Sequence, residues 1–434
     1  MYSAPIGMKR DGATNDMALE EAEEATSTDF DGSDDQGAGD VDDQIDQAIA
    51  QLSTDDFHDQ WIQAKRFVAQ FAHWGDRSIP LLLKHLKAQR NPDIQWFLVR
   101  ILSQFQHPSI VEALSELLMT TESEHLRSQV IKALVGTGES AIATLTDLLF
   151  ESNPSEQRLL AARVLAQIRR SATIEPLIGI ATDPNPLLRE IAIEALGSFH
   201  DPRITPLLLA ALKDDASICV EAVRTLGRRS DLTLTVDLVT PLAACLHAAS
   251  EAVACESAVA LGRLGHEKAI VALGEQLCAP LPTPVKVSIV QSLGWLNVPN
   301  AVAYLAAAFD CGVPVIMPVV QQALAKALGQ TRDPDLRAIA ARPLIAWLKR
   351  AEDLSDFALV QAVLSAIARL EEPAALESLI PVLSQPDARI RMHALSALKR
   401  IDPSAAQTRI QDYLHSDQLS AQEGQYVAEA LAAW

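Results

Sequence analysis

The sequence of 434 residues has few aromatic residues, which make up 5% of it, although 49% of its residues are hydrophobic. β-Sheets favour β-branched and aromatic residues, whereas close packing between helices is well served by Ala and Leu. The shortage of aromatic residues therefore favours an all-α fold over a fold built on sheets.

The sequence also lacks the segments typical of membrane and secreted proteins. No apolar run approaches the roughly 20 residues that a membrane-spanning helix needs. The first residues show no apolar core of a signal peptide. The five cysteines form no CxxC pair and suggest no disulfide framework in a chain of this length. We expect a soluble, cytoplasmic protein with no membrane span.

Basic residues are outnumbered, 36 against 56 acidic residues, which gives a net charge of -20. The first 50 residues hold 14 of the acidic residues and only Lys9 and Arg10 as basic ones. Such a segment has too little apolar surface to offset the entropy of ordering. We predict a disordered acidic tail over residues 1–46 and a folded domain over residues 47–434. Binding to nucleic acid, which needs a basic surface, is disfavoured.

Motifs for common catalytic chemistry are missing as well. We find no phosphate-binding Gly-rich loop, no HExxH and no GxSxG, and the ten histidines are dispersed. Nothing in the sequence points to hydrolysis or phosphoryl transfer. A protein that is not an enzyme, with no catalytic residues, is therefore favoured.

What is present is a leucine that recurs every 30 to 35 residues, an interval typical of two-helix solenoid units. Residues 251–277 show one complete unit, EAVACESAVALGRLGHEKAIVALGEQL, with apolar residues three and four positions apart in two short helices. Neither helix can bury its apolar face alone. We predict an α-solenoid of roughly 11 or 12 HEAT-like helical pairs. The landmark leucines, one in each second helix, are Leu102, Leu134, Leu165, Leu196, Leu226, Leu261 and Leu293.

One unit carries a resemblance to a known family. The segment DPNPLLREIAIEALGSFHDPRITPLLLAAL, residues 183–212, has an Asp-Pro turn, an early arginine in its second helix, and an Ala-Leu-Gly ending. It resembles the HEAT repeat of cyanobacterial phycobilisome-lyase-like proteins, and the likeness covers about residues 59–434. The resemblance implies second helices that line a groove. It also implies three known roles: a scaffold, a bilin lyase, or a partner of the A-type iron–sulfur carrier.

Basic residues recur seven positions before the landmark leucines. A guanidinium at that position can bond carboxylates and carbonyl groups of adjacent turns. We interpret these residues as a structural ladder, with contact to a ligand as the alternative. The ladder is interrupted at Cys219 and Ala254. It comprises Arg127, Arg158, Arg189, Lys286 and Arg391, the last of which has the same offset from Leu398.

All five cysteines lie between residues 219 and 311, where the ladder is interrupted. Cys219 occupies a ladder position, and Cys255 follows one directly. These two are candidates for a soft-metal or iron–sulfur site, which needs several converging thiolates. The alternative is that the cysteines, including Cys245, Cys278 and Cys311, are small core residues.

Side chains turned away from the core on the second helices supply a candidate partner-binding groove. The basic strip, two positions before successive landmark leucines, comprises Arg100, Lys132 and Arg163. It suits an acidic partner or the carboxylates of a bilin, whereas an ordinary solvated helix face is the alternative. Among the further groove candidates, the acidic residues would change the sign of the groove's charge midway, and two tryptophans could stack on a ligand or partner. These candidates are Glu194, Arg224, Glu221, Glu256, Trp96 and Trp295.

The sequence favours a scaffold or adaptor that binds another protein in this groove and needs no cofactor. Two alternatives depend on the resemblance. The first is a bilin lyase or chromophore chaperone acting on a phycobiliprotein, which would be an enzyme with bilin as its ligand. The second is an iron–sulfur assembly helper that partners an A-type carrier and handles a cluster.

Overall fold

A computed structural model describes residues 43, 44, 46, 47, 50, 71, 74–151, 154–233, 235–310, 318–350, 354, 356–416 and 419–434. Nearly all of the predicted acidic tail lies outside the described residues, and so does Cys311. Regular structure in these ranges is helical, and they contain no strand. The all-α prediction is confirmed.

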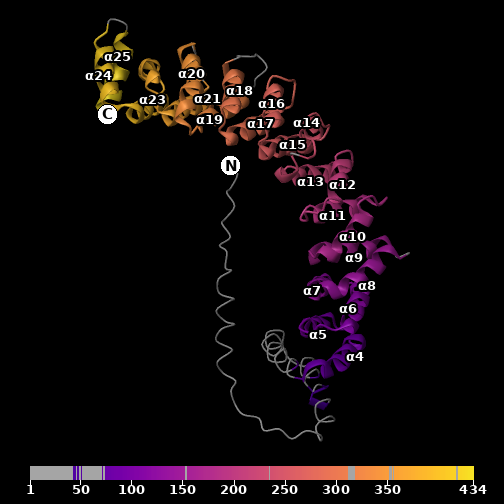
Figure 1. Ribbon diagram of the computed structural model, residues 1–434. Helices are drawn as coiled ribbons and strands as arrows, with labels where there is room; N and C mark the ends of the chain where they lie inside the picture. The colour runs from indigo at the N-terminus through magenta and orange to yellow at the C-terminus, as the bar shows by residue number, and fades with distance from the viewer. Residues whose placement is uncertain are drawn as a thin grey trace. The chain divides into compact units, whose positions relative to one another are not determined.

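The helices alternate as first and second members of eleven consecutive pairs within the described ranges (Figure 1). This number agrees with the solenoid predicted from the leucine interval. The first helices are α4 (Ile79–Ala88), α6 (Pro108–Thr120), α8 (Ile142–Phe150), α10 (Ile174–Ile180), α12 (Ile204–Ala211), α14 (Val239–Cys245), α16 (Glu267–Gln276), α18 (Pro299–Asp310), α20 (Pro334–Arg350), α22 (Leu376–Leu379) and α24 (Pro403–Leu414).

The second helices carry the landmark leucines. They are α5 (Pro92–Leu102), α7 (Glu124–Gly136), α9 (Ser155–Ile168), α11 (Pro186–Leu196), α13 (Ala216–Leu226), α15 (Glu251–Leu264), α17 (Thr283–Leu296), α19 (Pro318–Leu328), α21 (Phe357–Leu370), α23 (Ala388–Ile401) and α25 (Ala421–Ala432). Short 3-10 helices lead into or extend first helices: η1 (Gly75–Ser78), η2 (Gly138–Ala141), η3 (Ser171–Thr173), η4 (Ser230–Leu232), η5 (Pro373–Ala375) and η6 (Ile380–Ser384).

The described residues divide into two compact units. The first unit comprises those up to residue 114 and residues 121–133, and the second comprises residues 115–120 and 134–434. In the second unit each second helix from α9 to α23 packs against the second helix of the next pair, and each also contacts its own first helix. All seven landmark leucines are at most 1% exposed. Leucine spacing thus identifies the residues that join a second helix to the core.

The helix boundaries show how the sequence begins each element. Asn185, rather than the preceding Asp-Pro, caps α11: its side chain accepts a hydrogen bond from the backbone N–H of Leu187, and Pro186 opens the helix. Asp387 caps α23 in the same way. Short polar side chains are favoured there because they satisfy an N–H group that has no partner within the helix.

Two helices continue through residues that often end a helix. Gly262 lies inside α15, which ends at Leu264 and is followed by Gly265 as its C-cap, with a φ of 61°. The stretch 331–356 is largely α20, a helix of 17 residues with Pro343 inside it. A glycine costs a helix only about 1 kcal/mol, so tertiary packing can retain it.

Candidate partner-binding surface

Two arginines of the basic ladder fix their second helices to the loops that precede them. Arg189 Nη1 donates to the carbonyl oxygens of Asp183 at 2.9 Å and Pro184 at 3.1 Å. Arg391 Nη1 repeats this geometry with Gln385 and Pro386, at 3.0 and 2.9 Å. In these two helical pairs the loop carbonyls are therefore satisfied by a side chain from the following helix.

The ladder also connects successive pairs within the second unit. Arg158 Nη2 forms an ion pair with Asp183, 25 residues later. Arg189 repeats the step as a bidentate pair with Asp214, at 2.8 and 2.6 Å. Hydrogen bonds from Arg189 lower the pKa of Asp214 below its usual value, and those bonds raise the pKa of Arg189. These guanidinium groups are engaged by the fold itself.

Two further ladder members have different surroundings. In the first unit, Arg127 donates to the carbonyl oxygen of Thr121 at 2.8 Å and pairs with Glu124. In the second unit, Lys286 on α17 is buried at 5% exposure. Its position in the repeat places it among core residues of α17 such as Ile289.

The interruption of the ladder brings two thiols together. Cys219 Sγ donates to the carbonyl oxygen of Leu212 at 3.3 Å, and its thiol interacts electrostatically with that of Cys245. This interaction lowers the pKa of Cys245 to about 7. Both cysteines are buried free thiols. Sequence reasoning considered Cys219 together with Cys255, whereas the structure pairs it with Cys245.

The other cysteines give no support to a cluster site. Cys255 is half-buried on α15, and Cys278 is exposed. In the part of the chain that the structure describes, no three His, Cys, Asp or Glu side chains gather where they could hold a metal ion.

The outward positions of the second helices carry a mixture of free and paired charges. Arg163 on α9 and Glu194 on α11 are exposed, and neither side chain has a hydrogen bond or ion pair among the described residues. Arg224 on α13, by contrast, forms an ion pair with Glu221 and donates from Nε to Glu256 Oε1 at 3.3 Å.

Arg263 on α15 adds a fourth member to this ion-pair cluster, because its Nη1 lies 3.8 Å from the same Glu256 oxygen. The cluster therefore joins α13 to α15. Glu221 and Glu256, which were expected to form a free acidic spot, are neutralised by arginines. The change in the sign of the charge that the sequence predicts midway along the groove therefore does not arise from free carboxylates at these two residues.

Large apolar side chains are exposed on the same helices. Trp295 on α17 is 58% exposed, Val319 on α19 is 57% exposed, and Leu187 on α11 is 51% exposed. Trp295 stands two positions after its landmark leucine, the same offset as the exposed Arg228 and Arg263 in the two preceding pairs. Residues at one offset form a column in a solenoid, and α13, α15 and α17 are packing neighbours. We call the exposed side chains of Arg163, Leu187, Arg228, Arg263, Trp295 and Val319 the second-helix face.

Sequence reasoning identified Trp295 but missed Leu187 and Val319. Both stand nine positions before a leucine of the repeat, Leu196 and Leu328 respectively. A column at this offset would have shown two large apolar residues where neighbouring pairs have Ser217 and Pro284.

In the first unit, Trp96 is half-buried and stacks on His125, with ring centroids 5.4 Å apart and planes at 9°. The guanidinium carbon of Arg100 lies 5.5 Å from the centroid of the Trp96 ring. Lys132 is exposed on α7. Arg100 and Lys132 thus belong to one unit and Arg163 to the other, and each unit is described by itself.

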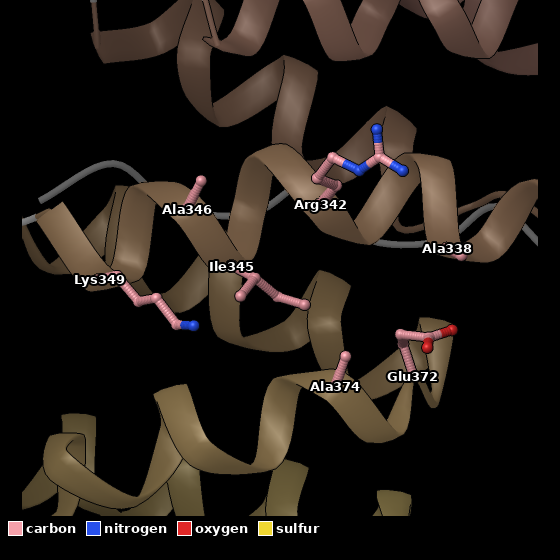
Figure 2. Close-up of a pocket in the computed structure, with 7 residues that line it drawn as sticks. All are labelled: Ala338, Arg342, Ile345, Ala346, Lys349, Glu372 and Ala374. Atoms are coloured by element: carbon pink, nitrogen blue, oxygen red, sulfur yellow. The ribbon is translucent and has the colours of Figure 1, made fainter.

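Two clefts lie elsewhere in the second unit. One of about 360 Å³ surrounds Arg189 and Asp214, whose charges pair with each other. The other, of about 420 Å³, lies between α20 and the segment that begins at η5. Figure 2 shows Ile345 and Lys349 directed from α20 toward Ala374 and Glu372. None of the site residues predicted from the sequence lines this second cleft.

Comparison with known families identifies HEAT repeats at residues 79–158 and 142–227. No curated protein matches the chain. None of the helices in the described ranges has the length and apolar character required to cross a membrane.

Solved structures of karyopherins are similar to the chain in fold. One of them concerns Kap95p, whose binding induces the switch loops of RanGDP to adopt the GTP-bound conformation. It has a TM-score of 0.52 at 14% identity, over 90% of this chain and 59% of that one. Importin beta in ammonium sulfate has a TM-score of 0.50 at 14% identity, over 96% of this chain and 64% of that one. Kap121p bound to the extreme C-terminus of the phosphatase Cdc14p has a TM-score of 0.55 at 13% identity, over 82% of this chain and 44% of that one.

The chain therefore spans between 44% and 64% of the length of these karyopherin chains. At such low identity the likeness shows the fold, a HEAT solenoid. The matches do not extend to the phycobilisome-lyase type that the sequence resembles.

Proposed function

We propose that the chain is a scaffold that binds a segment of another protein on the second-helix face of its second unit. The observation that carries this proposal is the exposure of Trp295, 58%, in one column with Arg228 and Arg263. A tryptophan exposed to this extent removes much apolar area from water when a partner covers it. Tryptophan and arginine are also the residue types that most often dominate binding energy at interfaces.

The charges of the face indicate the chemistry of the partner. Arg163, Arg228 and Glu194 have no ion pair within the described ranges, whereas Glu221 and Glu256 are already bonded to arginines, so free cations outnumber free carboxylates among these side chains. An acidic segment would therefore meet cations that are free to pair with it. Trp295, Val319 and Leu187 would contact its apolar side chains. We infer an acidic segment with interspersed apolar residues as the partner.

The similar solved structures are consistent with this use of the fold. Kap121p, which has the same architecture, was solved with the extreme C-terminus of a protein bound to it. The basic strip remains a proposal within each unit: Arg163 belongs to the proposed surface of the second unit, whereas Arg100 and Lys132 belong to the first unit. We do not propose the bilin-lyase or iron–sulfur roles, because no arrangement of described residues favours a tetrapyrrole or a cluster.

A double variant, Trp295→Ala with Arg228→Glu, tests the proposal. We expect recovery of the protein partner by the immobilised full chain to fall at least about 10-fold, because loss of a central aromatic anchor alone commonly costs about 2 kcal/mol. The measurement is quantitative mass spectrometry of proteins retained from a lysate of the source cells.

The matched control is Ile339→Ala with Arg342→Glu, which changes one exposed apolar and one exposed basic residue on the first helix α20. This control should retain the partner at the wild-type level. Equal recovery by all three baits would refute the assigned surface, and so would a loss that follows the α20 variant instead.

A further inference from the structure

The cleft of about 420 Å³ beside α20 follows from the two first helices that form it. α20 is one continuous helix of 17 residues. The first helix of the next pair is broken into η5, α22 and η6, which have three, four and five residues. A broken helix cannot fit its side chains into the grooves of a continuous one along the whole contact. An open space remains between them, which Figure 2 shows with its lining side chains.

One face of α20 forms the larger wall of this cleft. Its five lining residues follow one another at intervals of four, three, one and three positions, which places them on one side of a helix. Two of them are exposed cations that stand two turns apart, about 10 Å along the helix axis. Apolar side chains lie between the cations. The lining residues of α20 are Ala338, Arg342, Ile345, Ala346 and Lys349.

The opposite wall contributes a single carboxylate. Glu372 directly precedes η5, and its side chain makes no capping hydrogen bond to that helix. Figure 2 shows Glu372 and Ala374 facing α20 across the cleft. The cleft therefore presents two cations, one anion and an apolar surface between them.

The fold pairs neighbouring charges but not those of the cleft. Glu371 accepts a hydrogen bond from Arg400 Nε at 2.9 Å, and Arg337 Nη1 lies 4.0 Å from its other oxygen. The charged side chains that line the cleft have no ion pair or hydrogen bond within the described ranges. They are Arg342, Lys349 and Glu372.

We propose that this cleft binds a small amphipathic zwitterion of the acidic dipeptide class, with two carboxylates, one ammonium group and one apolar side chain. The carboxylates would pair with Arg342 and Lys349, and the ammonium group with Glu372. The apolar side chain would lie against Ile345 and Ala346. A volume of about 300–1,000 Å³ is usual for small-molecule sites, and this cleft lies within that range.

Charge complementarity distinguishes this ligand from a simple organic anion. A fatty acid has one carboxylate, which would leave one cation of the cleft without a partner and would bring no positive group to Glu372. A dipeptide with an acidic second residue matches every charge of the cleft with one of opposite sign. Because the cleft lies on first helices, this proposal does not depend on the protein partner proposed for the second-helix face.

Isothermal titration of the full chain with leucyl-glutamate tests the proposal, at low ionic strength because salt screens exposed charges. We expect saturable binding at one site. The double variant Arg342→Gln with Lys349→Gln should weaken this binding at least about 5-fold, because two ion pairs are lost that are individually weak at a surface. Absence of saturable binding by the wild type would overturn the proposal.

The matched control is Arg332→Gln with Lys268→Gln, which removes two exposed cations that do not line the cleft. This variant has the same net charge as the cleft variant and should bind leucyl-glutamate as the wild type does. Equal weakening by both variants would show a general effect of charge and would refute the assigned site.

The role of Glu372 is tested with N-acetyl-leucyl-glutamate, which lacks the ammonium group. The wild type should bind this derivative at least about 3-fold more weakly than leucyl-glutamate. Glu372→Gln should weaken binding of leucyl-glutamate alone, since only that ligand can pair with the carboxylate. Equal or tighter binding of the acetylated dipeptide by the wild type would contradict the zwitterion. This comparison needs no substitution, so the proposal remains testable if a variant fails to fold.

Discussion

At the scale of single residues, the sequence identified the ladder donors but not their acceptors. Seven positions before a landmark leucine is an offset within one helix, so helical geometry alone places Arg158 and Arg189. Their partners are loop carbonyls and Asp183 or Asp214 in another pair. The positions of those acceptors depend on how pairs pack, which no single-helix pattern specifies. The Cys219 interaction with Cys245 was missed for the same reason.

The bidentate pair of Arg189 and Asp214 should make stability depend on pH. Replacement Asp214→Asn removes the charge but keeps an oxygen that can accept from the backbone N–H of Asp215, as Asp214 Oδ1 does at 2.8 Å. We expect a loss of about 1–2 kcal/mol in the free energy of unfolding at pH 7, in the range of hydrogen bonds to charged groups. Urea unfolding monitored by circular dichroism provides the measurement.

The sign of the pH effect follows from the lowered pKa of Asp214 in the folded state. Its contribution is fully present above the ordinary Asp pKa and is lost as pH falls through the lowered value, so the difference between wild type and variant should close in acid. Asp215→Asn is the control, because Asp215 is more exposed and lies 3.4 Å from the same guanidinium. A gap that stays constant on acidification would contradict the assigned role.

At the scale of helices, the glycine after a landmark leucine has a role beyond ending the helix, as Gly227 does after α13. A glycine after a leucine is typical of a helix end. In the structure, a Cβ added to Gly227 would lie 2.6 Å from the Cβ of Ala260 on α15, and one added to Gly262 would lie 2.6 Å from the Cβ of Ser292. These glycines allow neighbouring second helices to approach, a property that depends on two helices and could not be read from one.

Gly227→Ala should therefore destabilise the second unit. The added methyl group meets the Ala260 backbone Cα at 2.7 Å, so the contact cannot be relieved by a flexible side chain. We expect a loss of about 1–3 kcal/mol, typical of overpacking. Thermal and urea unfolding followed by circular dichroism measure it.

Gly424→Ala is the matched control for this prediction. Gly424 lies within α25 and has nothing within 4 Å of an added Cβ. Alanine is the better helix former, so this variant should be neutral or more stable by up to about 1 kcal/mol. Equal destabilisation by both variants would show that close approach of α13 and α15 is not the cause.

At the scale of the whole molecule, the leucine interval was sufficient to predict the solenoid and the number of its pairs. The period is a property of the sequence, and burial of each apolar face by its neighbours follows from it. The binding surface was predicted less completely. Exposure of Leu187 and Val319, and the pairing of Arg224 with two glutamates, depend on neighbouring helices.

The central claim is that a protein partner lies against second helices, and lysine cross-linking of the partner-bound full chain tests it most directly. In the second unit, Lys326 and Lys399 are exposed on second helices, whereas Lys268 and Lys349 are exposed on first helices. Mass spectrometry of the cross-linked complex should find partner peptides joined to Lys326, and also to Lys399 if the segment extends that far. Partner cross-links confined to Lys268 and Lys349 would contradict the account.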